Sequence, residues 1–206
     1  MSIRANQRQE TRQKILEAAR SCLESGDLQS ASTREIAKRA GVAEGTIFHH
    51  FATKEELVLC CIGAQMAEAI EKGLYTMDPE WCFVDKLMHV ASYRFAQIGL
   101  HPGVWTVIMQ QMAFTPRKGA VNDVMKSSGL IRAIDDLIEE AQFCGELNPN
   151  LAPTMIRKSL MALFLFTVHE HMSTQNFDCE DMCATLRELI EVQTVGLWAS
   201  KPELAA

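Results

Sequence analysis

Apolar residues recur every three to four positions along most of this 206-residue chain. Between residues 11 and 24, for example, Ile15, Ala19 and Cys22 fall on one face of a helix and polar residues fill the other. This spacing is typical of amphipathic helices, and there is little of the alternation that marks a half-buried strand. The pattern predicts helices at 11–24, 33–40, 44–50, 54–75, 79–98, 102–112, 121–144, 154–172 and 179–197. We therefore expect an all-α protein.

Residues with known capping preferences mark several of the predicted helix ends. Ser32 stands three residues before Glu35, the capping-box spacing in which each side chain binds a backbone N–H at the helix start. Gly41 follows the same helix, where a left-handed residue ends many helices. Asp178 is placed to cap the last helix, and Gly99 to stop an earlier one.

The segments 33–40 and 44–50 are two short helices separated by a turn that contains Gly41. Ile36 of the first helix and Ile47 of the second are expected to face inward, which sets the two helices against each other. Two helices joined by such a turn form a helix-turn-helix, whose second helix enters the DNA major groove.

The distribution of charge agrees with a DNA-binding N-terminal part. Residues 1–54 hold nine Lys and Arg against six Asp and Glu, whereas residues 55–206 hold eleven against twenty. A basic N-terminal part on an acidic body indicates that only this part approaches phosphate. The alternative is a chance asymmetry on a solvated surface.

Three runs of residues in this region resemble the DNA-binding domain of the TetR family (AcrR/TetR type): 34–42 (REIAKRAGV), 45–51 (GTIFHHF) and 54–57 (KEEL). The resemblance implies an all-helical homodimer that binds double-stranded DNA and releases it when a small-molecule effector binds. We accordingly expect a three-helix helix-turn-helix domain at 1–53 and a helical ligand-binding and dimerisation domain at 54–206. The expected function is that of a ligand-responsive transcriptional regulator, a repressor, bound to a palindromic operator.

Candidate DNA contacts follow from the motif and from the resemblance. Backbone N–H groups at a helix start favour phosphate, so Thr33 and Arg34 are placed to hold the DNA backbone. Glu44, Gly45 and Thr46 begin the second helix, from which base edges are reached. The resemblance adds four positions from which the family contacts bases and phosphates: Phe48, His49, His50 and Lys54.

Two positions depart from the family pattern. Phe48 stands where the family usually has Tyr, so a hydroxyl contact to phosphate is lost. Ala43 stands where the family often has Ser, so the second helix lacks a side-chain cap.

The C-terminal helices offer candidates for an effector pocket and a dimer interface. Bundle interiors host ligand sites, and the large apolar residues of the middle helices are candidates for lining one: Met66, Trp81, Phe95, Trp105, Met109 and Phe164. The last two predicted helices hold more apolar residues than one buried face of each helix can accommodate. In the family, these two helices from each subunit form a four-helix dimer interface. The expected interface residues are Leu163, Phe164, Val168, Leu186, Leu189 and Ile190.

Composition limits the cellular setting. No apolar run approaches the roughly 20 residues of a membrane span, and the N-terminus lacks the apolar region of a signal peptide. Seven scattered cysteines are more typical of reduced thiols than of a disulfide framework. We therefore expect a cytoplasmic protein without a membrane partner.

Three other functions remain as alternatives. The adjacent Cys60 and Cys61 could sense thiol oxidation, and Cys179 and Cys183 could bind a metal with His169 or His171. An enzyme or a structural helical bundle is the third, although no nucleophile–base pair or phosphate-binding loop supports an enzyme. We predict no catalytic residue, no cofactor and no metal site.

Overall fold

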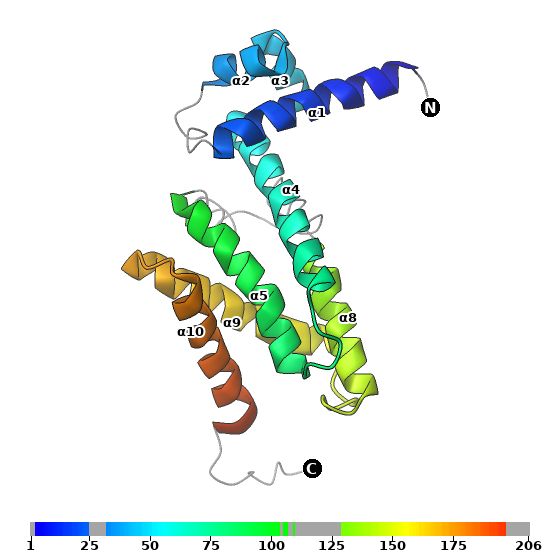
Figure 1. Ribbon diagram of the computed structural model, residues 1–206, viewed down its shortest axis with the longest axis vertical. Coiled ribbons are helices and arrows are strands. Elements are labelled where there is room, and N and C mark those ends of the chain that lie inside the picture. The colour runs from blue at the N-terminus through cyan, green and yellow to red at the C-terminus, as the bar shows by residue number, and fades with distance from the viewer. Residues whose placement is uncertain (1–2, 25–31, 104, 107–108, 110–128, 197–206) are drawn as a thin grey trace. The chain divides into compact units, whose positions relative to one another are not determined.

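The computed structural model describes residues 3–24, 32–103, 105–106, 109 and 129–196, and within these ranges the regular structure is helical, without strands (Figure 1). The predicted all-α class is confirmed. The helices are α1 (Ile3–Glu24), α2 (Thr33–Ala40), α3 (Glu44–His50), α4 (Lys54–Tyr75), α5 (Phe83–Leu100), α8 (Leu130–Phe143), α9 (Pro153–Thr174), α10 (Cys179–Glu191) and the π-helical turn η1 (Val192–Gly196). No described helix is long and apolar enough to cross a membrane.

The described chain forms two compact units, and the division between them falls inside α4, after Gln65. The predicted domain boundary at residues 53 and 54 lies twelve residues earlier on the chain, at the start of this helix, and stays a prediction. Because α4 contributes its first half to one unit and its second half to the other, we describe the units separately.

In the first unit, α1 packs against α2, and α2 against α3. The Ser32 hydroxyl accepts a hydrogen bond from the Glu35 backbone N–H (3.1 Å), and Gly41 is left-handed, with φ of 67°. The predicted capping signals at both ends of α2 are therefore present. Fully buried side chains of this unit come from all four helices: Ile15, Ala19, Cys22, Ile36, Ile47, Phe51 and Leu57.

The first helix is longer than the sequence pattern indicated. It begins at Ile3, whereas apolar periodicity placed its start at Thr11 and left residues 1–8 without structure. The extra turns are polar on every side, with exposed residues from Ala5 to Glu10, so no apolar stripe marks them.

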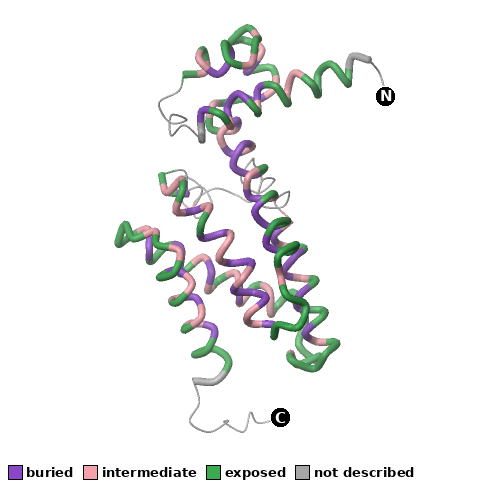
Figure 2. The backbone as a smooth tube through the Cα atoms, in the orientation of Figure 1, coloured by how far each residue is buried: buried purple, intermediate pink, exposed green. Residues whose placement is uncertain are grey.

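In the second unit, α10 packs against α5 and α9, and α8 packs against α5 and α9. Figure 2 shows buried positions recurring along α5 and α8, as expected for helices that each turn one face to a common core. The predicted cap of α10 is confirmed, because the Asp178 carboxylate accepts from the backbone N–H groups of Glu180 and Asp181.

Two predictions about α5 were wrong. The helix begins at Phe83 instead of residue 79, and a carboxylate oxygen of Glu146 accepts from the Phe83 N–H at 2.7 Å. Gly99 does not stop the helix, which continues to Leu100. A Cβ atom at Gly99 would lie 2.9 Å from the Phe177 carbonyl oxygen, so the glycine is explained by close packing. The predicted helix at 102–112 and the start of the one at 121–144 lie largely outside the described residues.

Candidate nucleic-acid interface and internal cavity

The recognition helix α3 is anchored by one fully buried residue, Ile47, which turns its neighbours outward. Glu44, Gly45 and His49 are exposed, and Phe48 keeps half of its surface exposed. The expected lack of a cap is also found, since Ala43 makes no side-chain hydrogen bond to the helix start. These candidate residues therefore share one accessible face of the first unit.

A side-chain hydrogen bond joins the starts of α2 and α3. The Thr33 hydroxyl lies 2.5 Å from a carboxylate oxygen of Glu44, to which it donates. Both residues were expected to contact DNA. In this structure they also fix the spacing of the two helix N-termini, where Arg34 is exposed.

The first turns of α1 complete this surface, a contribution that the sequence analysis missed. An open groove is lined by six residues of α1 and α3: Gln7, Arg8, Thr11, Thr46, His49 and His50. A helix that is polar on all sides has the same hydropathy pattern as an unstructured polar tail, so the pattern does not reveal it. The remaining signal was Arg4 and Arg8, two basic residues near the N-terminus that entered the sequence analysis only through the charge count of residues 1–54.

Positive charge gathers at this groove. Burial lowers the pKa of His50, and the neighbouring cations Arg8 and Arg12 lower it further. Arg12 is held in place, because its guanidinium lies over the Phe51 ring at 4.7 Å and donates to the Cys60 sulfur at 3.5 Å. A groove with fixed cations beside a recognition helix suits a phosphate backbone. Lys54, the last of the expected contacts, is half-buried at the start of α4.

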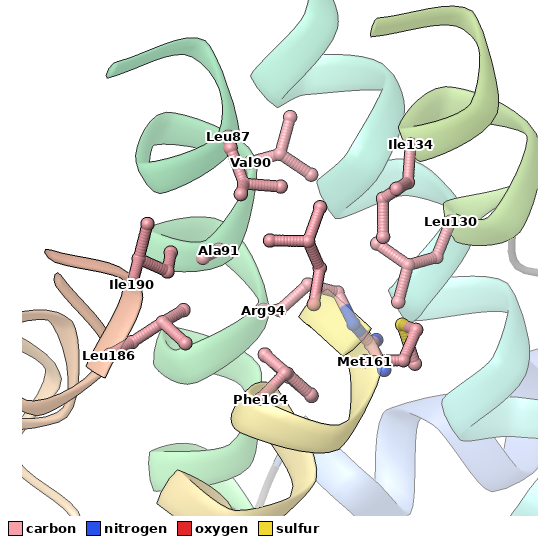
Figure 3. A pocket seen from close by; sticks show the side chains of 11 residues that line it. Leu87, Val90, Ala91, Arg94, Leu130, Ile134, Met161, Phe164, Leu186 and Ile190 are labelled. Atoms are coloured by element: carbon pink, nitrogen blue, oxygen red, sulfur yellow. The ribbon is translucent and has the colours of Figure 1, made fainter. Parts of the chain in front are cut away.

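The second unit contains a small apolar cavity with about 20 Å³ of space for water-sized molecules. Four helices line it, α5, α8, α9 and α10, as the labelled side chains in Figure 3 show. The lining residues are Leu87, Val90, Ala91, Arg94, Leu130, Ile134, Leu160, Met161, Phe164, Leu186 and Ile190. All of them except Arg94 are apolar.

Arg94 is fully buried, with 0% of its surface exposed, and none of its three guanidinium nitrogens has a hydrogen-bond partner among the described residues. Burial lowers the pKa of Arg94 to about 9. Trp105 lies against the guanidinium, 5.1 Å from its carbon to the ring centroid, and its own indole N–H is likewise buried without an acceptor. The cavity thus holds two donor groups with no acceptor supplied by the described protein.

The six residues expected to line a pocket have different locations. Phe164 lines the cavity, Phe95 stacks on Phe164 with ring centroids 5.0 Å apart, and Trp105 contacts Arg94. Met66, Trp81 and Met109 are not among the residues lining this cavity. Sequence reasoning missed Arg94 because a charged residue is ordinarily assigned to solvent. The available signal was its place in the apolar stripe formed by Leu87, Ala91 and Ile98.

The residues expected at a dimer interface are mostly inside the protomer. Four of the six are buried in the second unit, namely Phe164, Val168, Leu186 and Ile190. Leu163 and Leu189 are partly exposed. The apolar side chains that α9 exposes are others, Met155 at 60% and Phe166 at 54%.

The cysteine alternatives find little chemical support. No disulfide joins the seven cysteines, all of which lie in described segments. Burial raises the pKa of Cys61 to about 12, and it raises the pKa of Cys60 despite the nearby Arg12. Protonated thiols react slowly with oxidants.

The proposed metal ligands are also engaged elsewhere. The His171 ring nitrogens lie 2.9 Å from the Asn176 carbonyl oxygen and 3.1 Å from the Thr185 hydroxyl. Burial raises the pKa of Cys183 to about 12. No group of three or more His, Cys, Asp or Glu among the described residues is arranged to hold a metal ion.

Comparison with known proteins connects the helix-turn-helix to one family. The family described as "Bacterial regulatory proteins, tetR family" matches residues 15–61, which span the helix-turn-helix. Over 187 residues the chain is 24% identical to the fatty acid metabolism regulator protein of Bacillus subtilis, covering 89% of this chain and 93% of that protein. It is 26% identical to the transcriptional regulator UidR of Escherichia coli K12 over 163 residues, covering 75% and 78%.

The same fold occurs in the crystal structure of Thermus thermophilus FadR, a TetR-family transcriptional repressor in complex with lauroyl-CoA. The TM-score is 0.73 at 16% sequence identity, over 95% of this chain and 99% of that one. The helix-turn-helix of this protein is therefore that of the tetR family of bacterial regulatory proteins, and along most of its length the chain is similar to transcriptional regulators.

Proposed function

We propose that the protein is a repressor that binds a palindromic operator as a homodimer and leaves it when a small-molecule effector occupies the cavity of the second unit. The enclosed cavity with its unpartnered arginine is the observation that carries this proposal. A helix-turn-helix needs no such cavity to bind DNA, so its presence favours a regulator that responds to a ligand. As a DNA-binding regulator, the protein is assigned to the cytoplasm.

On DNA, we assign base contacts to Thr46 and His49, which lie on the accessible face of α3. Arg34 and Lys54 are assigned to DNA phosphates. The other exposed or half-buried residues of this surface contact the DNA backbone or let α3 come close to the major groove. Contributions of this kind are assigned to Thr33, Glu44, Gly45, Phe48 and His50, and to the groove residues Gln7, Arg8 and Thr11.

Pairing of two chains is assigned to the outer faces of α9 and α10. A single helix-turn-helix buries too little surface for tight, specific binding, so two half-sites must be read together. Met155 and Phe166 supply the exposed apolar surface on α9, and the partly exposed Leu163 and Leu189 lie at its margin. The other members of the expected set, Phe164, Val168, Leu186 and Ile190, are buried within the protomer.

Release is a population shift carried by α4, because this helix begins in the DNA-binding unit at Lys54 and ends in the cavity unit at Tyr75. The effector binds preferentially to a conformer in which α4 is tilted. In that conformer the two recognition helices no longer match successive major grooves.

The effector has a predominantly apolar body, because ten of the eleven lining residues are apolar. The solved relative with lauroyl-CoA provides one reference compound class, fatty acyl compounds. The proposal is tested by selecting operators from random duplex DNA and repeating the gel-shift with fatty acyl compounds added. We expect a palindromic operator and dissociation on addition; failure to select any sequence contradicts the DNA-binding part.

A further inference from the structure

We propose that the effector is an amphipathic carboxylate whose anionic head binds Arg94 inside the cavity and whose apolar body packs against the apolar side chains that line it. This inference rests on the proposed function and specifies the chemistry of its ligand. It differs from a coenzyme A thioester, whose charges lie on phosphates that must stay in solvent.

The buried, unpaired guanidinium of Arg94 carries a desolvation penalty. A guanidinium has five N–H donors and stays positively charged. Removing it from water without hydrogen-bond partners is costly unless an opposite charge compensates. Arg94 has no exposed surface, and none of its guanidinium nitrogens has a partner among the described residues. A ligand that supplies an anion removes this cost when it binds.

The described residues that line the cavity offer Arg94 no carboxylate. None of the lining side chains contains oxygen, and Figure 3 shows the guanidinium reaching from α5 toward Met161 of α9.

Three acidic residues of α5 and α8 are paired with other cations. Asp135 binds Arg157 (2.7 Å), Glu140 binds Lys86 (2.8 Å) and Asp85 binds Arg187 (2.8 Å).

The contact with Trp105 leaves the Arg94 donors available. The Arg94 Cζ lies over the Trp105 ring, 5.1 Å from its centroid, a cation–π contact that uses none of the guanidinium N–H groups as hydrogen-bond donors. A carboxylate presents two oxygens in the plane of those donors, and the resulting bidentate pair is among the stronger hydrogen-bonded contacts in proteins. The buried indole N–H of Trp105 is a second donor without an acceptor.

The space beside Arg94 in this structure is small, about 20 Å³, which is room for a water molecule. The lining helices therefore move apart when the carboxylate binds, and its body then lies against their apolar side chains. The thioester carbonyl of a coenzyme A compound brings no charge to Arg94.

The test compares compounds that share one alkyl chain and differ in the head group. Titration calorimetry on the full-length protein at pH 7.5 uses decanoate, decanol, decylamine and decanoyl-CoA. We expect decanoate to bind at least about tenfold more tightly than decanol, in line with a charge-assisted hydrogen bond, and decylamine not to bind. Equal affinity for decanoate and decanol overturns the inference, as does binding of decanoyl-CoA alone.

A variant pair locates the charge. Arg94→Met keeps an apolar chain of similar length. It should abolish the preference for decanoate over decanol and leave the affinity for decanol unchanged. Arg132→Met is the matched control, because Arg132 lies on α8 but its side chain is 88% exposed. It should leave both affinities unchanged. If Arg94→Met does not fold, the head-group series on the unmodified protein still decides.

Operator release separates this inference from the proposed function. Release by decanoate supports both. Binding of decanoate without release keeps the carboxylate site and contradicts the release mechanism. Release by decanoyl-CoA with no binding of decanoate overturns the carboxylate site and keeps the ligand-responsive repressor.

Discussion

At the scale of single residues, Arg94 opposes folding, because it is a buried cation without a partner among the described residues. Its lowered pKa, about 9, has the same cause, since burial disfavours the charged form. The proposed ligand contact provides a functional reason for an arginine at this position.

The first prediction is a gain of stability. Arg94→Met should raise the free energy of unfolding of the unliganded protein by about 1–4 kcal/mol, because an apolar side chain replaces an uncompensated charge. Chemical denaturation of both proteins measures the difference. Arg132→Met serves again as the control and should change stability little. A destabilised Arg94→Met protein would mean that the guanidinium has a counterion in the free state.

The second prediction concerns His50, whose pKa is lowered first by burial and then by Arg8 and Arg12. Arg8→Gln removes one of the cations, so the pKa of His50 should rise toward its ordinary value of 6.5 without reaching it, since burial remains. Proton NMR titration of the imidazole provides the measurement. Arg34→Gln is the control, because Arg34 is not among the groups that lower the pKa of His50.

The same substitution has a consequence for DNA binding, which follows from the groove that Arg8 and His50 share. Bound phosphate favours the imidazolium, so the complex takes up a proton as the pH falls from 8 toward 6. Removing Arg8 should also reduce the salt dependence of operator affinity by about one counterion. An unchanged salt slope would place Arg8 away from the backbone.

At the scale of helices, the sequence identified those with an apolar stripe and an orthodox cap. Ser32, Gly41 and Asp178 mark ends that the structure contains. It missed the first turns of α1, because residues that are exposed on every side of a helix produce no periodicity. The start of α5 was misplaced because its N–H partner is Glu146, which is sixty-three positions away along the chain.

The two candidate sites also differ in how far the sequence predicts them. The recognition helix was found because its turn, spacing and aromatic residues are local properties of one short segment. The cavity was found only in part, since lining residues from four separate helices meet through tertiary packing, which no local pattern records. Phe164 was identified by size, and Arg94 was overlooked although it lies in an apolar stripe.

The third prediction is at this scale and concerns the close approach at Gly99. Gly99→Ala should destabilise the protein by about 1–3 kcal/mol, because the new Cβ atom would meet the Phe177 carbonyl oxygen at 2.9 Å. Thermal unfolding measures the loss. Gly45→Ala is the control, since nothing lies within 4 Å of its Cβ position. Equal stability of the two variants would show that the backbone near Phe177 moves aside at little cost.

At the scale of the whole molecule, the fourth prediction tests pairing. Phe166→Glu places a charge in the proposed interface, and symmetry introduces it twice, so the dimer should dissociate and operator affinity should collapse. Sedimentation measures the first effect and a gel-shift the second. Phe143→Glu is the control, because Phe143 of α8 is 93% exposed and lies outside the proposed face. A dimeric Phe166→Glu protein would place the interface elsewhere.

The position of α4 in both units has a thermodynamic consequence that applies in both directions. If occupancy of the cavity weakens operator binding by a given factor, operator DNA must weaken ligand binding by that same factor. A repressor already seated on its operator is therefore a poorer sensor than the same protein in solution. The concentration of metabolite that clears the promoter is set by this difference, and not by the affinity of the free protein alone.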